Sequence, residues 1–182
     1  MKRVLATLII LATLSACKKE NTNETTDVKD TLSVNNTEKK VEKNLPIYSL
    51  NQVSELVNKK NDTLYVTNFF ATWCGPCVRE IPHFREKITE LEGQPVKFTF
   101  VNFDEPKEWN TKVKAFGNEY KISDHIILLD INTLNDDFFA QNFKTWDGNS
   151  IPFTILRKGD KVEEIVGMVS KEELENKINS LK

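Results

Sequence analysis

Short apolar runs alternate with amphipathic segments from Leu45 to the end of the chain. Runs rich in β-branched and aromatic residues predict strands, and apolar residues at helical spacing predict helices. The expected strands are 46–50, 63–71, 96–103 and 125–130, and the expected helices are 51–60, a segment from Cys74 to a left-handed cap at Gly93, 107–120 and 134–143. Strands that alternate with helices favour βαβ crossovers and a largely parallel sheet.

The carboxyl-terminal part breaks this alternation. Residues 152–156, the turn 157–161 and residues 162–169 predict an antiparallel hairpin. A last helix is expected after Ser170, which forms a capping-box pattern with Glu173. Leu174, Ile178 and Leu181 are spaced to pack that helix on the sheet. We therefore expect one α/β domain, 45–182, with a mixed central sheet flanked by helices.

The amino-terminal residues have a different pattern. Residues 1–16 combine Lys2 and Arg3 with an apolar stretch and a small-residue end, which is the layout of a secretory signal. "LSAC" resembles the lipobox of bacterial lipoproteins, which implies a lipid on Cys17; an ordinary signal peptide with a chance cysteine is the alternative. Residues 17–44 are polar and charged, with almost no large apolar side chains, and predict a disordered tether that spans about 30 Å. The expected location is the cell envelope, lipid-anchored to a membrane and facing the periplasm.

Charge and cysteine usage limit the chemistry. The formal net charge is −2 and becomes −4 without Lys2 and Arg3, so no basic surface indicates nucleic acid. The chain has three cysteines, and two of them, Cys74 and Cys77, are separated by two residues. A structural zinc site needs four ligands, and no second pair with suitable spacing is present. A redox dithiol is favoured over a metal site or a disulfide that only stabilises the fold.

The position of the pair assigns roles to the two thiols. Cys74 lies where a strand gives way to a helix, and the partial positive charge of a helix N-terminus favours a thiolate. Only Cys74 is expected to be exposed, whereas Cys77, one turn later, is expected to face inward and to stay protonated. We therefore expect Cys74 to form the mixed disulfide and Cys77 to resolve it. Pro76 suits the first turn of the helix.

The motif resembles the active site of the thioredoxin fold. The resemblance rests on "WCGPC" at 73–77, a strand before it, Pro82 after it and "SIPF" at 150–153 before a terminal hairpin. It implies that Pro152 has a cis peptide bond and packs opposite the dithiol. Thioredoxin has a buried acid six positions before its first cysteine, where this chain has Asn68. "CGPCVREIP" instead matches the C-x-P-C-x-x-E-x-P pattern of TlpA/ResA-like reductases, which also insert an extra βα unit, here within 96–130.

Three further residues complete the candidate site. The resemblance implies that Glu80 lies near the dithiol and assists proton movement, and a carboxylate there could relay a proton to Cys77; a solvated acid in the first turns of the helix is the alternative. Trp73 is expected to shield the thiols and contact a partner, with core packing as the rival interpretation. Ile151 is expected to pair through its backbone with an extended substrate strand.

These features predict a membrane-anchored envelope thiol:disulfide oxidoreductase that reduces protein disulfides and needs no cofactor. Its partners would be protein disulfide substrates and an upstream envelope electron donor. A thiol oxidant or disulfide isomerase of the same fold is the alternative within enzymes. A peroxiredoxin-like peroxidase is disfavoured, because Ala71 stands where a threonine is expected. A tethered peptide-binding module without turnover is the alternative outside enzymes.

Overall fold

The computed structural model of the chain describes residues 44–182. The predicted signal peptide, the lipid on Cys17 and nearly all of the tether therefore lie outside the described residues. Within the described part, no helix has the length and apolar character needed to cross a membrane.

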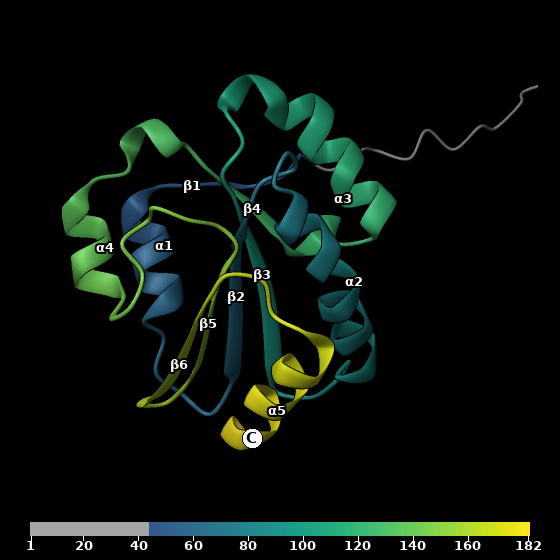
Figure 1. Cartoon of the computed structure of the whole chain (residues 1–182), viewed down its shortest axis with the longest axis vertical. Coiled ribbons are helices and arrows are strands. Elements are labelled where there is room, and N and C mark those ends of the chain that lie inside the picture. The colour runs from purple at the N-terminus through teal and green to yellow at the C-terminus, as the bar shows by residue number, and fades with distance from the viewer. Residues whose placement is uncertain (1–43) are drawn as a thin grey trace, which may run out of the picture. The chain divides into compact units, whose positions relative to one another are not determined.

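The core of the domain is a mixed sheet of six strands in the order β1-β4-β3-β2-β5-β6 (Figure 1). The strands are β1 (Ile47–Tyr48), β2 (Leu64–Phe70), β3 (Val96–Asn102), β4 (Ile126–Leu129), β5 (Phe153–Lys158) and β6 (Lys161–Val166). The first four strands pair in parallel, whereas β5 is antiparallel to β2 and to β6. The predicted mixed sheet is confirmed, and β4, which lies within the segment 96–130 where we predicted an extra βα unit, is placed between β1 and β3.

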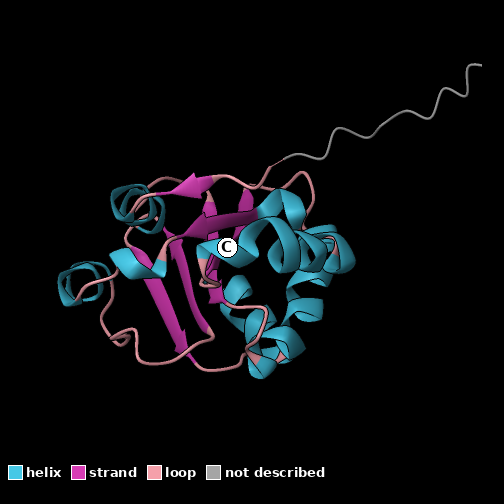
Figure 2. Ribbon diagram, turned by 90° about the horizontal axis from the view of Figure 1, so that it is seen from above, coloured by secondary structure: helices cyan, strands magenta, loops and turns pink. Residues whose placement is uncertain are grey.

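Helices cover both faces of this sheet. They are α1 (Leu50–Val57), α2 (Gly75–Glu90), α3 (Lys114–Tyr120), α4 (Asp136–Asn142) and α5 (Lys171–Leu181). The view from above shows α1 and α4 on one side of the strands and α2, α3 and α5 on the other (Figure 2). The result is a three-layer α/β arrangement with β2 near its centre.

Every residue of β2 is buried, which explains its apolar sequence. Successive side chains of a strand point to opposite faces. Phe69 accordingly meets Phe143 and Trp146 on the side of α4, while Phe70 meets Phe100 and Phe116 on the side of α3. Asn68 shares the face of Phe70 and therefore points toward the layer that contains α2.

Local details differ from the sequence-based predictions at two places. The helix α2 continues through Pro82 but ends at Glu90 with Leu91 as its cap, so Gly93 is not the cap that we predicted. Gly93 does have a left-handed backbone (φ 78°), and it serves the turn that follows the helix. The predicted helix over 107–120 begins with a 3₁₀ turn (Pro106–Glu108) and a π turn (Trp109–Val113) before α3.

The last helix agrees with its prediction. The Ser170 hydroxyl accepts a hydrogen bond from the backbone N–H of Glu173, as a capping side chain does. Leu174, Ile178 and Leu181 are its buried residues. This apolar face fixes α5 against the sheet and against α2.

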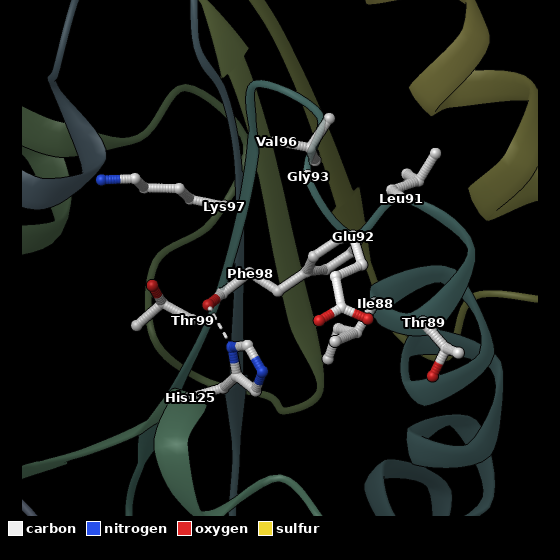
Figure 3. Close-up of a pocket in the computed structure, with 10 residues that line it drawn as sticks. All are labelled: Ile88, Thr89, Leu91, Glu92, Gly93, Val96, Lys97, Phe98, Thr99 and His125. Carbon is white, nitrogen blue, oxygen red and sulfur yellow. Dashed lines mark hydrogen bonds between the residues drawn. The ribbon is translucent and has the colours of Figure 1, made fainter.

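A hollow of about 430 Å³ lies where α2 ends and β3 begins (Figure 3). The rim includes Glu92 and His125, and the ring nitrogen Nδ1 of His125 lies 3.2 Å from the carbonyl oxygen of Phe98. None of the candidate site residues lines it. The dithiol lies at the opposite end of these elements, at the start of α2.

Candidate redox site

The two cysteines of the motif form a disulfide at the N-terminus of α2. Cys74 is the N-cap residue, and its Sγ accepts a hydrogen bond from the backbone N–H of Cys77 at 3.3 Å. The same N–H would face a Cys74 thiolate in the reduced protein, because it is one of the N-terminal donors that lack a partner within the helix. The predicted position of Cys74 at a strand-to-helix transition is confirmed.

The two sulfurs differ in their access to solvent, but by less than we expected. Cys74 is only 5% exposed and Cys77 is fully buried. We predicted an exposed Cys74, and that prediction is wrong in degree. The reason is cover from the loop before β5, where the carbonyl oxygen of Ile151 lies 3.7 Å from the Cys74 Sγ. Cys74 therefore offers little exposed surface to a partner.

A buried acid that sequence reasoning missed fixes the turn between β2 and α2. Asp104 accepts hydrogen bonds from the Thr72 backbone N–H (2.8 Å) and hydroxyl (2.5 Å) and from the Asn102 side-chain amide (2.7 Å). Phe70 and Asn102 pair at the carboxyl ends of adjacent parallel strands, so the residues that follow them meet. Polar residues after two neighbouring strands are the signal that could have found this contact.

The loop before β5 brings Pro152 toward the dithiol. The Ile151–Pro152 peptide bond is cis, as the resemblance implied. The carbonyl oxygen of Pro152 accepts a hydrogen bond from the Gly167 backbone N–H at 2.9 Å. Together with the contact between Ile151 and the Cys74 sulfur, this places both predicted residues of the loop at the site.

Contacts within and around residues 144–151 hold this loop in place. Glu164 of β6 accepts hydrogen bonds from the backbone N–H groups of Lys144 and Thr145, and the Trp146 indole N–H donates to the carbonyl of Ser150 at 2.7 Å. Gly148 has a left-handed backbone (φ 84°), and a Cβ at this position would lie 2.3 Å from the ring of Phe139. Only glycine fits both the conformation and the space.

Glu80 lies one turn after Cys77 on α2, and its side chain is fully buried. Its two carboxyl oxygens accept hydrogen bonds from the side-chain amide of Asn68 and from the backbone N–H of Val169, both at 2.8 Å. Burial raises the pKa of Glu80 to about 7, against the lowering effect of the hydrogen bonds from Val169 and Asn68. The interpretation of Glu80 as a solvated acid is therefore wrong.

Asn68 connects Glu80 to the strand β5. One nitrogen, Nδ2, donates to Glu80 and also to the Thr154 hydroxyl oxygen at 3.0 Å. The register explains this contact, because Asn68 and Thr154 are direct partners across β2 and β5. The carbonyl oxygen of the same amide, Oδ1, is buried and has no hydrogen-bond partner among the described residues. Sequence reasoning noted Asn68 only as a departure from thioredoxin.

Trp73 is 71% exposed, so the rival interpretation of core packing is wrong. Beside it a groove of about 560 Å³ reaches Cys74, with Phe103, Leu134 and Ile151 among its walls. No charged side chain of the described residues lines this groove. The surface next to the reactive sulfur is thus apolar and aromatic, and it suits contact with a polypeptide.

The described residues contain no cluster of three or more His, Cys, Asp or Glu side chains that could hold a metal ion. The arrangement can instead exchange disulfides. It combines a cysteine pair at a helix N-terminus, a buried acid, Glu80, that titrates near neutral pH, and an open groove that leads to Cys74.

Comparison with curated proteins gives relatives with the same chemistry in their names. Thiol-disulfide oxidoreductase ResA of Geobacillus kaustophilus (strain HTA426) is 29% identical over 117 residues, which cover 63% of this chain and 61% of that protein. Thioredoxin-like protein YneN of Bacillus subtilis (strain 168) is 30% identical over 112 residues, which cover 62% of this chain and 61% of that protein. The chain thus matches about three fifths of the length of these relatives.

The solved structures show the fold. A thiol:disulfide interchange protein of the thioredoxin family from Chlorobium tepidum TLS has a TM-score of 0.56 at 22% identity, and the match covers 67% of this chain and 82% of that one. The structure of MTB dsbF has a TM-score of 0.52 at 20% identity, and the match covers 67% of this chain and 83% of that one. The predicted thioredoxin-like fold is confirmed. Residues 37–163 match the profile of the AhpC/TSA family, and the chain belongs to that family.

Proposed function

We propose that this protein is a thiol-disulfide oxidoreductase of the cell envelope, which reduces protein disulfides through Cys74 and Cys77. The observation that carries the proposal is the asymmetry of the pair. One sulfur caps α2 and lies at the end of an apolar groove, while the other is fully buried one turn before Glu80. A disulfide that only stabilised the fold would need neither the groove nor the buried acid.

The reaction begins with the reduced dithiol. The Cys74 thiolate attacks one sulfur of the substrate disulfide, forms a mixed disulfide and releases the other substrate sulfur as a thiolate. Cys77, once deprotonated, attacks the Cys74 Sγ. This second step breaks the mixed disulfide, releases the remaining substrate sulfur and forms the Cys74–Cys77 bond. Two electrons pass from the dithiol to the substrate, and an upstream envelope donor returns them.

Glu80 is proposed to take the proton of Cys77 in the second step. A pKa of about 7 keeps both the carboxylate and the acid populated near neutral pH, which is the requirement for a group that accepts and returns a proton. Cys77 itself is fully buried, so water is a poor competitor for that proton. Glu80 would carry the proton until the donor restores the dithiol.

The substrate is proposed to lie in the groove as an extended polypeptide. The exposed ring of Trp73 and the apolar side chains of Phe103 and Leu134 would cover the residues next to the substrate cysteine. The backbone of Ile151 lies at the sulfur and would pair with the substrate strand. Because the groove has no charged wall, apolar flanking residues should be preferred over charged ones.

The membrane part of the proposal rests on the sequence. A lipid on Cys17 would anchor the domain of residues 45–182 through the polar tether of residues 17–44, after removal of residues 1–16. This arrangement would keep the dithiol outside the cytosol, where protein disulfides persist.

The reduction potential of the pair tests the direction of the reaction. The protein is equilibrated with thiol-disulfide buffers of known potential, and the Cys74–Cys77 bond is quantified by alkylation. Thioredoxin has a potential of about −270 mV and DsbA of about −120 mV. We expect a value nearer to thioredoxin, together with reduction of a protein disulfide supplied as substrate. A value near that of DsbA would replace the reductase with an oxidant.

Changing both Cys74 and Cys77 to Ser tests whether the protein is an enzyme. If it were only a binding module, the double variant would still capture partners as the wild type does. We expect the wild type to reduce a protein disulfide supplied as substrate and the double variant to lose this activity; a wild type without the activity and a double variant with undiminished capture would support the binding module.

A further inference from the structure

The side-chain amide of Asn68 has an unusual set of contacts for a buried group. Asn68 is 1% exposed, and both hydrogen bonds of its side chain are made by Nδ2, to Glu80 Oε1 and to Thr154 Oγ1. Its Oδ1 is buried without a partner among the described residues. A buried acceptor without a donor destabilises a fold by about 1–3 kcal/mol. The orientation therefore has a cost that the contacts to Glu80 and Thr154 must offset.

The two ends of an amide differ only in whether they donate or accept. In the observed orientation Asn68 donates, which matches a Glu80 carboxylate. Once Glu80 is protonated, its hydroxyl needs an acceptor, and the other partner of Glu80, the Val169 backbone N–H, is a donor that cannot change. A half-turn of the Asn68 amide would place Oδ1 where Nδ2 now lies, facing Glu80 and Thr154.

Thr154 suits both orientations. Its hydroxyl oxygen accepts from Asn68 in the observed state. A hydroxyl can also donate, so after the half-turn Thr154 would donate to Oδ1 alongside the protonated Glu80. The position opposite Asn68 thus holds a side chain that can reverse its role together with the amide.

We propose that Asn68 is a positioning residue for Glu80: its amide donates to the carboxylate in one orientation and accepts from the carboxylic acid after a half-turn. This inference rests on the proposed role of Glu80 in the resolving step. The amide would hold the carboxyl in one place while the proton comes and goes. Asn68 acts only through Glu80 and need not contact the substrate.

The surroundings leave few other groups that could control this proton. On α2, Cys77 is the titratable neighbour one turn before Glu80, and Lys87, about two turns after it, is paired with Glu90 and Glu175. From β2 and β5, the side chains in this hydrogen-bond network are those of Asn68 and Thr154, and both are uncharged. At the start of α5, Lys171 pairs with Glu86.

Nuclear magnetic resonance of the oxidised full-length protein tests the inference, because the disulfide removes the thiols from the titration. In the wild type, the carboxyl carbon of Glu80 and the side-chain amide of Asn68 are followed against pH. We expect both to titrate with one midpoint, and the contact from the Asn68 Nδ2 protons to Thr154 to be lost below it. An amide contact that persists unchanged across the titration would overturn the inference.

Asn68→Leu removes both functions of the amide. We expect the midpoint of the Glu80 titration to rise by about one unit, a tenfold change in the ratio of acid to carboxylate, because the charge-assisted hydrogen bond to the carboxylate is stronger than the one from the neutral acid, so losing both disfavours the carboxylate more. Asn142→Leu is the matched control, since Asn142 is also a buried amide with several hydrogen bonds but lies on α4. It should lower stability and leave the Glu80 midpoint unchanged.

An unchanged Glu80 midpoint in a folded Asn68→Leu protein would overturn the proposal. The wild-type titration needs no variant, so it decides the question even if Asn68→Leu fails to fold. Neither experiment requires turnover. A protein that reduces no disulfide but shows the linked titration would refute the proposed function and leave the role of Asn68 intact.

Discussion

Replacing Glu80 by Gln should make the protein more stable at alkaline pH and change little at acid pH. The pKa of Glu80 is about 7 in the folded protein, against 4.5 for an unperturbed glutamate, so the folded state binds the proton more tightly. Between these two values the folded protein carries more protons than the unfolded chain, and the free energy of unfolding falls as the pH rises. A glutamine side chain does not titrate, so the variant avoids this loss.

The size of the effect follows from the shift. The pKa of Glu80 differs by about 2.5 units between the folded and unfolded states, and at about 1.36 kcal/mol per unit this changes the free energy of unfolding by about 3 kcal/mol. Urea unfolding of the oxidised proteins at pH 4 and pH 8 measures it, because the disulfide keeps the thiols out of the comparison. We expect the stability of Glu80→Gln relative to the wild type to increase by about 3 kcal/mol between the two pH values.

A matched control lies on the same helix. Glu86 is an exposed acid whose pKa is lowered by its hydrogen bond and charge interaction with Lys171. The stability that Glu86 contributes is present above its unfolded pKa and is lost as the pH falls. The stability of Glu86→Gln relative to the wild type should therefore decrease slightly between pH 4 and pH 8, a smaller change than that of Glu80→Gln and of opposite sign. A difference between wild type and Glu80→Gln that does not change with pH would refute the reasoning about the buried carboxyl.

Three further experiments test other parts of the protein. In the reduced protein, alkylation at neutral pH should modify Cys74 before Cys77, which is fully buried; equal rates would contradict the assigned roles. Gly148→Ala should lower the free energy of unfolding by about 1–3 kcal/mol more than Gly93→Ala in urea unfolding, because both have left-handed backbones but only Gly148 lacks space; equal losses would argue against tight packing of this loop. Cys17→Ser should release the protein from the membrane fraction or leave its signal uncleaved, and unchanged lipid labelling would exclude the anchor.

The sequence was sufficient to predict the order and type of most elements. Strands such as 63–71 have a strong apolar pattern, and the terminal helix has both a cap and an apolar face. Predictions at the ends of elements were weaker. Gly93 was assigned as the helix cap because it is the glycine that follows the apolar pattern, yet the helix ends at Glu90 and the glycine serves a later turn.

The dithiol and the proline loop could be predicted because their residues form recognisable motifs. The supporting contacts could not, since they join residues far apart in the sequence. Asp104 reaches Thr72 across two parallel strands, and Asn68 meets Thr154 through the register of β2 and β5. The surroundings of Glu80 also include the segment before α5, because the Val169 backbone N–H donates to its carboxylate, and helical spacing alone does not reveal this contact.

Trapping of the mixed disulfide tests the central claim most directly. Cys77→Ser removes the thiol that resolves the adduct and leaves Cys74 at the helix N-terminus, so the variant should accumulate dithiothreitol-sensitive adducts with disulfide-containing proteins of the envelope. Cys74→Ser is the matched variant and should capture few, because the remaining thiol of Cys77 is buried. Equal capture by the two variants, or none by Cys77→Ser, would contradict attack by Cys74 and resolution by Cys77.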